Sequence, residues 1–233
     1  MDVPVTPKFS FNTKQEFVYQ ALRDAIMRCE LPPGHRLVIQ AIADEYQVSP
    51  IPVREALRLL NSENLVEHRP HIGAVVAPIT SSSVVEIFTL KEGLEAVTAR
   101  VAVEKLTSDK MAEIETILEK MDATLRDERY EDWGDLNAAF HEAFAAATEM
   151  PMLIEMNRRV LDRWNRVRRY FFKEVVVHRL FQSQEEHHEI VQAARNGDGE
   201  AAERLVKAHN QGALRDYSAR GSNLTFGTAD LNR

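Results

Sequence analysis

Apolar residues recur every three or four positions along most of the chain, which is the spacing of helices that bury one face. The first such segment covers residues 13–30 and is ended by the Leu-Pro-Pro-Gly sequence at 31–34. Two shorter segments, 39–46 and 53–60, follow, and the period breaks between them at 47–49. Two short helices joined by a tight corner are the pattern of a helix-turn-helix.

The second short helix carries side chains that are suited to DNA. We expect it to begin near Pro52, because Ile51 precedes that proline and is thereby pushed out of the helical region. Arg54 and Arg58 then lie on one exposed face, where guanidinium groups can bind guanine edges or phosphate. The alternative is an ordinary amphipathic helix whose charged face is simply solvated.

A short hairpin is predicted directly after this helix. Asn64 suits a left-handed cap, and residues 65–67 and 74–76 have the composition of strands. The polar, basic segment 68–73 is expected to join them as the tip of the hairpin. Helix, turn, helix and hairpin together predict a winged helix-turn-helix domain over residues 13–78.

The chain from residue 83 to residue 219 has helical spacing and no convincing strand, so it predicts a second, all-helical domain after a linker at 79–82. Its helices are expected at residues 82–106, 109–128, 133–148, 150–173, 183–196 and 199–219. The apolar stripe of the first of these is formed by Ile87, Leu90, Leu94, Val97 and Val101. Antiparallel packing gives a bundle of six to seven helices, and the fold class is mainly α.

Both ends of the chain lack a periodic pattern. Residues 1–12 are predicted to be a flexible arm and residues 220–233 a disordered tail. No apolar run approaches the roughly 20 residues that span a bilayer, and the start lacks the features of a signal peptide. These observations predict a cytoplasmic protein without a membrane partner. Cys29 is the only cysteine, so neither an internal disulfide nor a thiolate metal cluster is expected.

The net charge of −7 argues at first against a nucleic-acid partner, but the negative charge is unevenly distributed along the chain. Residues 1–78 carry eight Lys and Arg against nine Asp and Glu, so the predicted head has a charge of only −1. Its affinity for DNA would depend on a few placed contacts and on dimerisation.

A second basic cluster lies in the fourth helical segment of the second domain: Arg158, Arg159, Arg163, Arg166, Arg168, Arg169 and Lys173. Because these positions wind around the helix, we interpret them mainly as a solvated face with ion pairs. One or two of them can point inward to an anionic ligand.

Three histidines of the second domain share the phase of its buried faces. His187 and His209 lie on the apolar stripes of their helices, and His141 borders such a stripe, with Asn137 one turn before it. Buried imidazoles need partners, and a divalent metal ion would satisfy all of them at once. Taken singly, a histidine on an apolar stripe is more often a hydrogen-bonded core residue than a metal ligand.

The head resembles the winged-helix domain of the GntR superfamily of bacterial transcription regulators, in the runs VSPIPVREALRLL and LVEHRPHIGAVV. The superfamily usually has an arginine and a threonine where this chain has Pro50 and Ile51, and often an arginine where it has Gln40. The resemblance therefore does not carry over the usual operator sequence. The residues expected to contact DNA are Arg54, Arg58, Ser49, Gln40 and His71.

Residues 80–218 resemble the FCD effector domain of FadR-type GntR regulators, through NAAFHEAFAAAT and EEHHEIVQAARNGDGEAAERLVKAH. Metal-binding members place an Asp or Asn four residues before a histidine, and then two more histidines separated by 21 residues. The metal ligands that this pattern implies are Asn137, His141, His187 and His209. It also implies a divalent ion, zinc or nickel, and a small carboxylate effector. Lys91 is the candidate anchor for that effector, where the family often has an arginine.

These features predict a transcription regulator, expected to be a repressor, that binds operator DNA as a homodimer and is not an enzyme. A metal-dependent, hydrolase-like enzyme is the alternative from another class. Only Glu185-x-x-His188 fits the motif of a di-iron bundle, and neither HExxH nor G-x-G-x-x-G occurs. A metal sensor without an organic effector is the other alternative.

Overall fold

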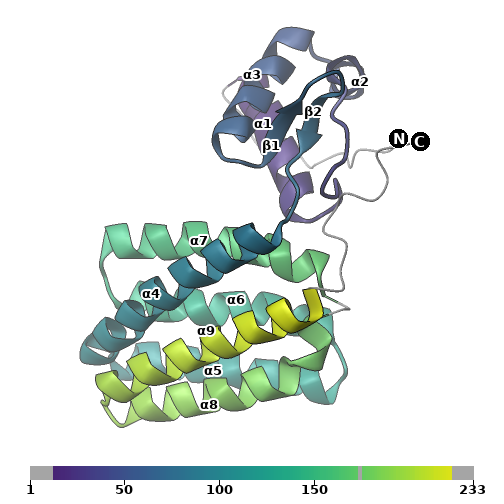
Figure 1. Cartoon of the computed structure of the whole chain (residues 1–233). Coiled ribbons are helices and arrows are strands. Elements are labelled where there is room, and N and C mark those ends of the chain that lie inside the picture. Colours follow the sequence, from purple (N-terminus) through teal and green to yellow (C-terminus); the bar gives the residue numbers. More distant parts are fainter. Residues whose placement is uncertain (1–12, 173–174, 222–233) are drawn as a thin grey trace. The chain divides into compact units, whose positions relative to one another are not determined.

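The computed structural model describes residues 13–172 and 175–221, which form two compact units (Figure 1). The first unit ends at Thr80 and the second begins at Ser81. The division therefore falls within the segment 79–82, where the linker is expected.

The ends of the helical domain differ slightly from the prediction. Helix α4 (Ser81–Lys105) begins inside the predicted linker, because serine is well suited to the first turn of a helix as well as to a loop. Helix α9 (Gly199–Gly221) ends two residues beyond the predicted position. The predicted arm at 1–12, and residues 222–233 of the predicted tail, lie outside the described residues.

The first unit consists of three helices and a two-stranded hairpin: α1 (Lys14–Met27), α2 (Ile39–Glu45), α3 (Pro50–Ser62), β1 (Val66–Arg69) and β2 (Gly73–Val76). The hydroxyl of Thr13 caps α1 by accepting the backbone N–H of Glu16 at 3.1 Å. The corner between α2 and α3 passes through Gln47, which has a φ of 52°. The winged helix-turn-helix is confirmed.

Helix α3 begins two residues earlier than predicted. Ser49 occupies its N-cap position, and Pro50 and Pro52 both lie in the first turn. Backbone N–H groups there have no partner within the helix, so neither proline costs a hydrogen bond. The expectation that Ile51 lies outside the helix was wrong, because the bias of a residue before proline is outweighed by the burial of Val53, which is fully enclosed.

The hairpin is slightly longer than predicted, because Arg69 pairs with Gly73 across the two antiparallel strands. The turn is thereby reduced to residues 70–72, with His71 in the left-handed region at a φ of 64°. Asn64 has a φ of 58°, which confirms the left-handed cap expected after α3. The hairpin, which forms the wing, therefore begins shortly after the end of α3.

The core of the first unit lies between α1, α3 and the hairpin. Val18, Leu22 and Ile26 of α1 meet Val53 and Leu60 of α3 there, and all five are fully buried. The polar faces of α2 and α3 lie outside this core and are exposed to solvent.

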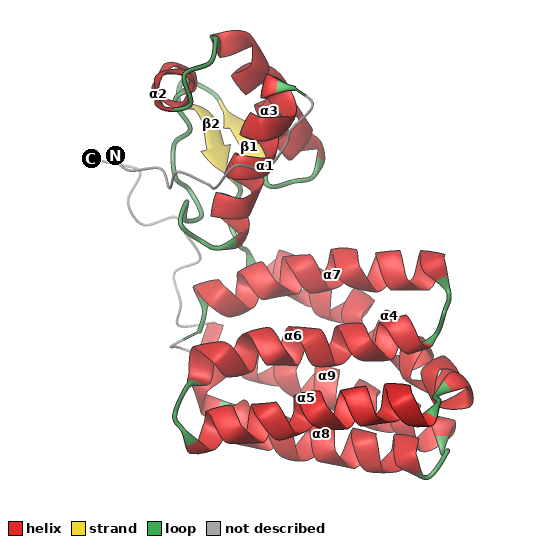
Figure 2. Cartoon of the chain, turned by 180° about the vertical axis from the view of Figure 1, so that it is seen from behind, coloured by secondary structure: helices red, strands yellow, loops and turns green. Residues whose placement is uncertain are grey.

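The second unit contains six α-helices in its described part, which confirms the predicted bundle. Figure 2 shows these helices in red. Between α4 and α9 come α5 (Ser108–Arg126), α6 (Tyr130–Ala147), α7 (Pro151–Tyr170) and α8 (Leu180–Arg195), with a short 3-10 helix at Val176–His178. None of the helices in the described ranges is long and apolar enough to cross a membrane.

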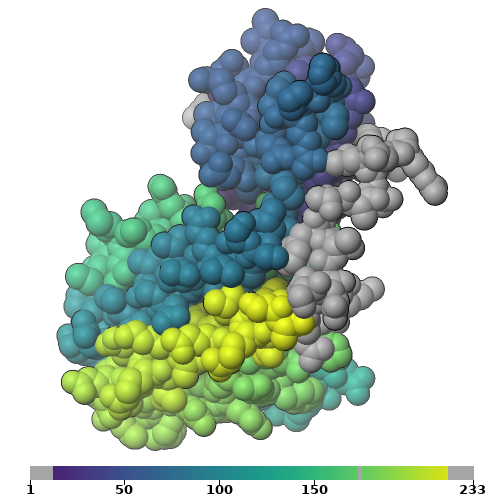
Figure 3. All heavy atoms as spheres, viewed as in Figure 1, coloured from purple at the N-terminus to yellow at the C-terminus, as the bar shows by residue number. Residues whose placement is uncertain are grey.

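Helix α4 lies along α9 on one face of the second unit (Figure 3). The apolar stripe predicted for α4 was wrong at two positions, because Leu90 and Val97 are 47% and 42% exposed. Ile87 is buried as expected, but the buried face also carries Lys91 and Glu95. Helix α4 therefore turns charged residues inward and leaves apolar residues at its surface.

Candidate functional site

Three histidines from three helices converge in the interior of the second unit. His141 comes from α6, His187 from α8 and His209 from α9, and one ring nitrogen of each lies within 4.8 Å of those of the other two. Their ring centroids are 4.8 to 5.8 Å apart. The helical phase of these residues thus predicts the convergence that the structure has.

His187 is the most enclosed of the three, with an exposed fraction of 0%. Neither of its ring nitrogens has a hydrogen-bond partner among the described residues, and the same is true of Nε2 of His141. Buried polar atoms are almost always hydrogen-bonded in folded proteins. These nitrogens are therefore available to a ligand.

Two of the three imidazole rings, those of His141 and His209, contact a carboxylate through Nδ1. Nδ1 of His141 lies 3.3 Å from Oε1 of Glu95, and Nδ1 of His209 lies 2.6 Å from Oε2 of Glu186. A neutral imidazole that donates its Nδ1 hydrogen to a carboxylate keeps the lone pair of Nε2 for another partner. Histidines that bind metal ions commonly have such a second partner.

Burial lowers the pKa of all three histidines below the ordinary value. The charge of Lys91 lowers the pKa of His141 further, and His209 has the same effect on the pKa of His187. At His209 the hydrogen bond with Glu186 opposes the effect of burial on the pKa. Neutral imidazole, the form that binds metal ions, is therefore favoured in the cluster.

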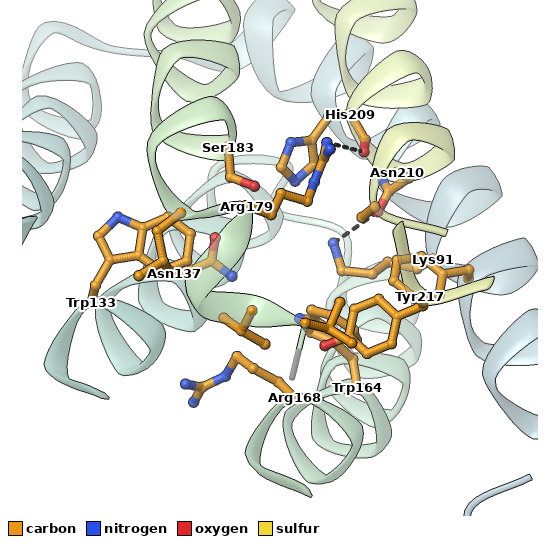
Figure 4. A pocket seen from close by; sticks show the side chains of 15 residues that line it. Lys91, Trp133, Asn137, Trp164, Arg168, Arg179, Ser183, His209, Asn210 and Tyr217 are labelled. Carbon is orange, nitrogen blue, oxygen red and sulfur yellow. Dashed lines mark hydrogen bonds between the residues drawn. The ribbon is translucent and has the colours of Figure 1, made fainter. Parts of the chain in front are cut away.

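A cavity adjoins the cluster, and Figure 4 shows Lys91, Asn137 and His209 around it. The centre of a water-sized sphere can occupy a volume of about 40 Å³ there. Other polar and aromatic residues of the wall are Phe88, Trp133, Trp164, Arg168, Arg179, Ser183, Asn210 and Tyr217.

Lys91 is 2% exposed, and its ammonium already has two partners. Nζ donates to Oε2 of Glu95 at 2.6 Å and to Oδ1 of Asn210 at 3.0 Å. Burial lowers the pKa of Lys91, and the carboxylate of Glu95 opposes that effect. An ammonium has three hydrogens, so one remains for an acceptor in the cavity. Sequence analysis found Lys91 but neither of these partners.

Two buried arginines flank the cavity, and each lies against a glycine. Nη1 of Arg168 is 1.6 Å from the position that a Cβ of Gly134 would occupy, and Nη2 of Arg179 is 2.6 Å from the corresponding position at Gly212. Arg168 pairs with Asp135 at 2.8 Å, and Arg179 pairs with carboxylates of α8 and α9. A glycine in the interior of a helix lowers stability, so its presence indicates that another group packs closely against the backbone there. Gly134 and Gly212 could therefore have indicated these two arginine contacts, but the sequence analysis did not use them.

The second basic cluster divides into surface and interior residues. Arg158 pairs with Glu155 at the surface of α7. Arg166 and Arg168 are buried, which confirms the inward position expected for one or two of these residues; an anionic ligand for them stays a prediction. Lys173 lies outside the described residues.

The residues that were expected to contact DNA are all exposed on the first unit: Gln40, Ser49, Arg54, Arg58 and His71. Arg58 pairs with Glu55 at 2.9 Å, and Nε2 of Gln40 donates to Oδ1 of Asp44 at 2.8 Å. Arg54 forms no ion pair with any residue that the structure describes. Arg54 is thus the arginine of α3 that is best placed to bind a new partner.

A winged helix-turn-helix followed by a helical domain with a polar interior defines a class of protein, the two-domain transcription regulator. The chain belongs to the gntR family of bacterial regulatory proteins, which it matches over residues 14–76, and its residues 86–212 match the FCD domain. The matched families and the named relatives are transcription regulators and not enzymes.

Individual relatives agree with this assignment. The chain is 30% identical over 202 residues to the HTH-type transcriptional regulator LutR of Bacillus subtilis, covering 77% of this chain and 90% of LutR. It is 26% identical over 194 residues to the HTH-type transcriptional repressor RspR of Escherichia coli, covering 83% and 84%. Among solved structures, a putative GntR regulator from Rhodococcus sp. RHA1 superposes with a TM-score of 0.71 at 26% identity, covering 88% of this chain and 98% of that one.

Proposed function

We propose that this transcription regulator is a cytoplasmic repressor whose affinity for operator DNA is controlled by a small carboxylate bound beside a metal ion. The observation that carries the proposal is the cluster of three buried imidazoles next to a cavity lined by cations. Because buried nitrogens without partners cost free energy, a cluster that contains three of them is suited to a ligand.

A divalent ion fits this set of donors. Neutral imidazoles are good ligands for zinc and nickel, and His141, His187 and His209 would hold the ion. Asn137, which is buried and lines the adjoining cavity, would offer an amide oxygen. A bound ion would supply an open coordination position that attracts a carboxylate oxygen.

The cavity supports a small anion as the second component. Lys91 presents a remaining ammonium hydrogen there, and Arg168 and Arg179 line the same wall. The limited volume favours an acid of a few carbon atoms over a long acyl chain.

Helix α4 offers a route from this cavity to the head. It carries Lys91 and Glu95 in the cavity region and begins at Ser81, the residue at which the second unit starts. A ligand can shift an equilibrium only by binding two states differently, and one that takes a hydrogen of Lys91 would bias the position of α4.

We infer that the regulator acts as a homodimer through the exposed face of α4. Leu90 and Val97 lie on that face, and Gly93 between them has nothing within 4 Å of the position of its absent Cβ. A glycine in mid-helix lowers helix stability by about 1 kcal/mol relative to alanine. Close approach of a second helix at this position would explain why a glycine is present there. In an antiparallel pair of α4 helices centred on Gly93, Glu86 of one copy would lie near Arg100 of the other.

The test of the dimer is the mass of the full-length protein by analytical ultracentrifugation. Leu90→Lys combined with Val97→Lys should convert a dimer to a monomer, because a charge placed in an apolar interface is costly. Val85→Lys, at an exposed position on another side of α4, is the matched control and should leave the mass unchanged.

The test of the regulator uses DNA fragments that the full-length protein selects from a genomic pool. Fluorescence anisotropy should show binding that weakens about 10- to 100-fold in Arg54→Ala, the usual effect of losing a bidentate base contact. Arg126→Ala, an exposed position of the helical domain, is the control.

Added zinc or nickel, together with short carboxylic acids, should then change the affinity for the selected DNA. If the metal alone changes the affinity and no acid does, the protein is a metal sensor. If neither changes it, the regulatory part of the proposal is wrong although the DNA-binding part stands.

A further inference from the structure

Two uncharged donors in the wall of the cavity have no hydrogen-bond partner among the described residues. The indole N–H of Trp164 and the hydroxyl of Tyr217 are buried and make no hydrogen bond within the described residues. The neighbouring Trp133 differs, because its indole donates to Oε1 of Gln184 at 2.9 Å. Trp164 and Tyr217 therefore stand out even among the aromatic residues of the same wall.

Both side chains are held in place by other rings. Phe88 packs against Trp164 with ring centroids 4.9 Å apart, and Trp164 packs against Tyr217 at 5.2 Å. Tyr217 also contacts Phe171, at 6.1 Å between the ring centroids. Fixed donors of this kind lose little conformational entropy when a ligand binds.

The chemistry of these two groups determines what they can bind. An indole N–H only donates, and burial raises the pKa of Tyr217, so that its hydroxyl stays protonated and can donate as well. Both are neutral. The cations of the same wall, Lys91, Arg168 and Arg179, are paired with carboxylates of the protein, although Nε of each arginine has no hydrogen-bond partner among the described residues. The matching group is an acceptor without charge, since the cations of the wall are already paired and a second carboxylate would be buried without a counter-charge at high cost.

We propose that Trp164 and Tyr217 select an effector that carries a hydroxyl or keto oxygen at the end remote from its carboxylate. This inference rests on the proposed function, in which the histidine and Lys91 side of the cavity takes the carboxylate. Figure 4 shows Lys91 between His209 on one side and Trp164 and Tyr217 on the other. The small cavity volume restricts the ligand to a short ω-hydroxy or ω-keto acid.

Calorimetric titration of the full-length, zinc-supplemented protein tests this assignment with two matched pairs of acids. The pairs are 3-hydroxypropionate with propionate, and 4-hydroxybutyrate with butyrate. In at least one pair the hydroxy acid should bind about tenfold more tightly, as expected for an acceptor that satisfies otherwise unpartnered donors. Tyr217→Phe and Trp164→Phe should each reduce that preference several-fold.

Thermal melting separates this role from a structural one. Because the hydroxyl of Tyr217 has no partner, Tyr217→Phe should melt at the same or a higher temperature than the parent in the absence of acid. Trp133→Phe, which breaks the bond with Gln184, should melt lower and keep the preference for the hydroxy acid. Tyr170→Phe, outside the cavity, should change neither quantity.

The outcomes distinguish the two proposals. If both members of each pair bind equally, or if Tyr217→Phe and Trp164→Phe keep the preference, Trp164 and Tyr217 do not select the ligand although the carboxylate site stands. If no acid binds the parent protein, the effector site itself is refuted, and this inference with it.

Discussion

The two domains bury different kinds of side chain. In the first, every buried residue that the structure describes is apolar. In the second, the buried residues include Lys91, Glu95, Asn137, Arg168 and His187. Burying a polar or charged group costs desolvation free energy unless its partners are present. This cost arises in the interior of the helical domain and not in that of the head.

The difference shows where each domain keeps its functional groups. The head uses its interior only for stability and presents polar groups on its outer surface, where DNA can reach them. The helical domain places its polar groups inside, where low polarity strengthens their interaction with a ligand. Substitutions in the two interiors should therefore have opposite consequences for stability and for binding.

The largest effect is expected from Leu60→Ala in the core of the head. Leu60 is fully buried, and removal of such a side chain costs about 2–5 kcal/mol. Both tryptophans, Trp133 and Trp164, lie in the helical domain, so urea unfolding followed by tryptophan fluorescence reports on that domain and circular dichroism reports on both. The unfolding transition of the head, which circular dichroism detects and fluorescence does not, should move to a lower urea concentration, and the fluorescence transition should stay unchanged. Equal shifts in both signals would contradict independent cores.

The next largest effect is expected from His187→Leu in the core of the helical domain. Because neither nitrogen of His187 has a partner, the metal-free variant should unfold at the same or a higher urea concentration than the parent. Zinc at 100 times its dissociation constant should stabilise the parent by about 2.7 kcal/mol and should not stabilise the variant. His188→Leu, at an exposed position, is the control and should keep the response to zinc. A metal-free variant that unfolds much earlier would show that His187 is an ordinary core residue.

The fold of the head could be predicted because local rules and packing agree there. The period of the apolar residues, the cap at Asn64 and the composition of the wing all act within a few residues of each other. The start of α3 was predicted less well, since a local bias at Ile51 competes with the burial of Val53. The exposure of Leu90 on α4 was missed because apolar residues at helical spacing indicate burial, whereas exposed apolar residues also occur on protein surfaces.

The candidate site could be predicted only in part. Helical phase and spacing identify the three histidines, but they do not show which polar residues approach from other helices. Glu95 and Glu186 contact histidines 46 and 23 positions away in the sequence, and Asn210 reaches Lys91 across 119 positions. Such contacts depend on the packing of whole helices, and charged residues in a sequence usually indicate a solvated face.

A smaller effect is expected from Glu186→Gln, which keeps the shape of the side chain and removes its charge. Glu186 orients His209 through a contact of 2.6 Å, and loss of such a partner typically weakens metal binding about 10- to 100-fold. Competition for zinc against a chromophoric chelator measures this change. Glu185→Gln, the exposed neighbour, is the matched control. Equal zinc affinity in the two variants would mean that the carboxylate of Glu186 serves only to pair with Arg179.

The smallest effect is expected at Asn64, where the head depends on backbone conformation and not on side-chain burial. Its φ of 58° is tolerated by asparagine, is free of strain for glycine and is unfavourable for alanine. Asn64→Ala should therefore lower the free energy of unfolding of the head by about 1 kcal/mol, and Asn64→Gly should change it by less than about 0.5 kcal/mol. Urea unfolding followed by circular dichroism measures both, and the zinc response of the helical domain should be the same in the two variants. If Asn64→Ala altered that response, the stability of the head and the ligand site of the bundle would be coupled, and the separation of roles between the two interiors would fail.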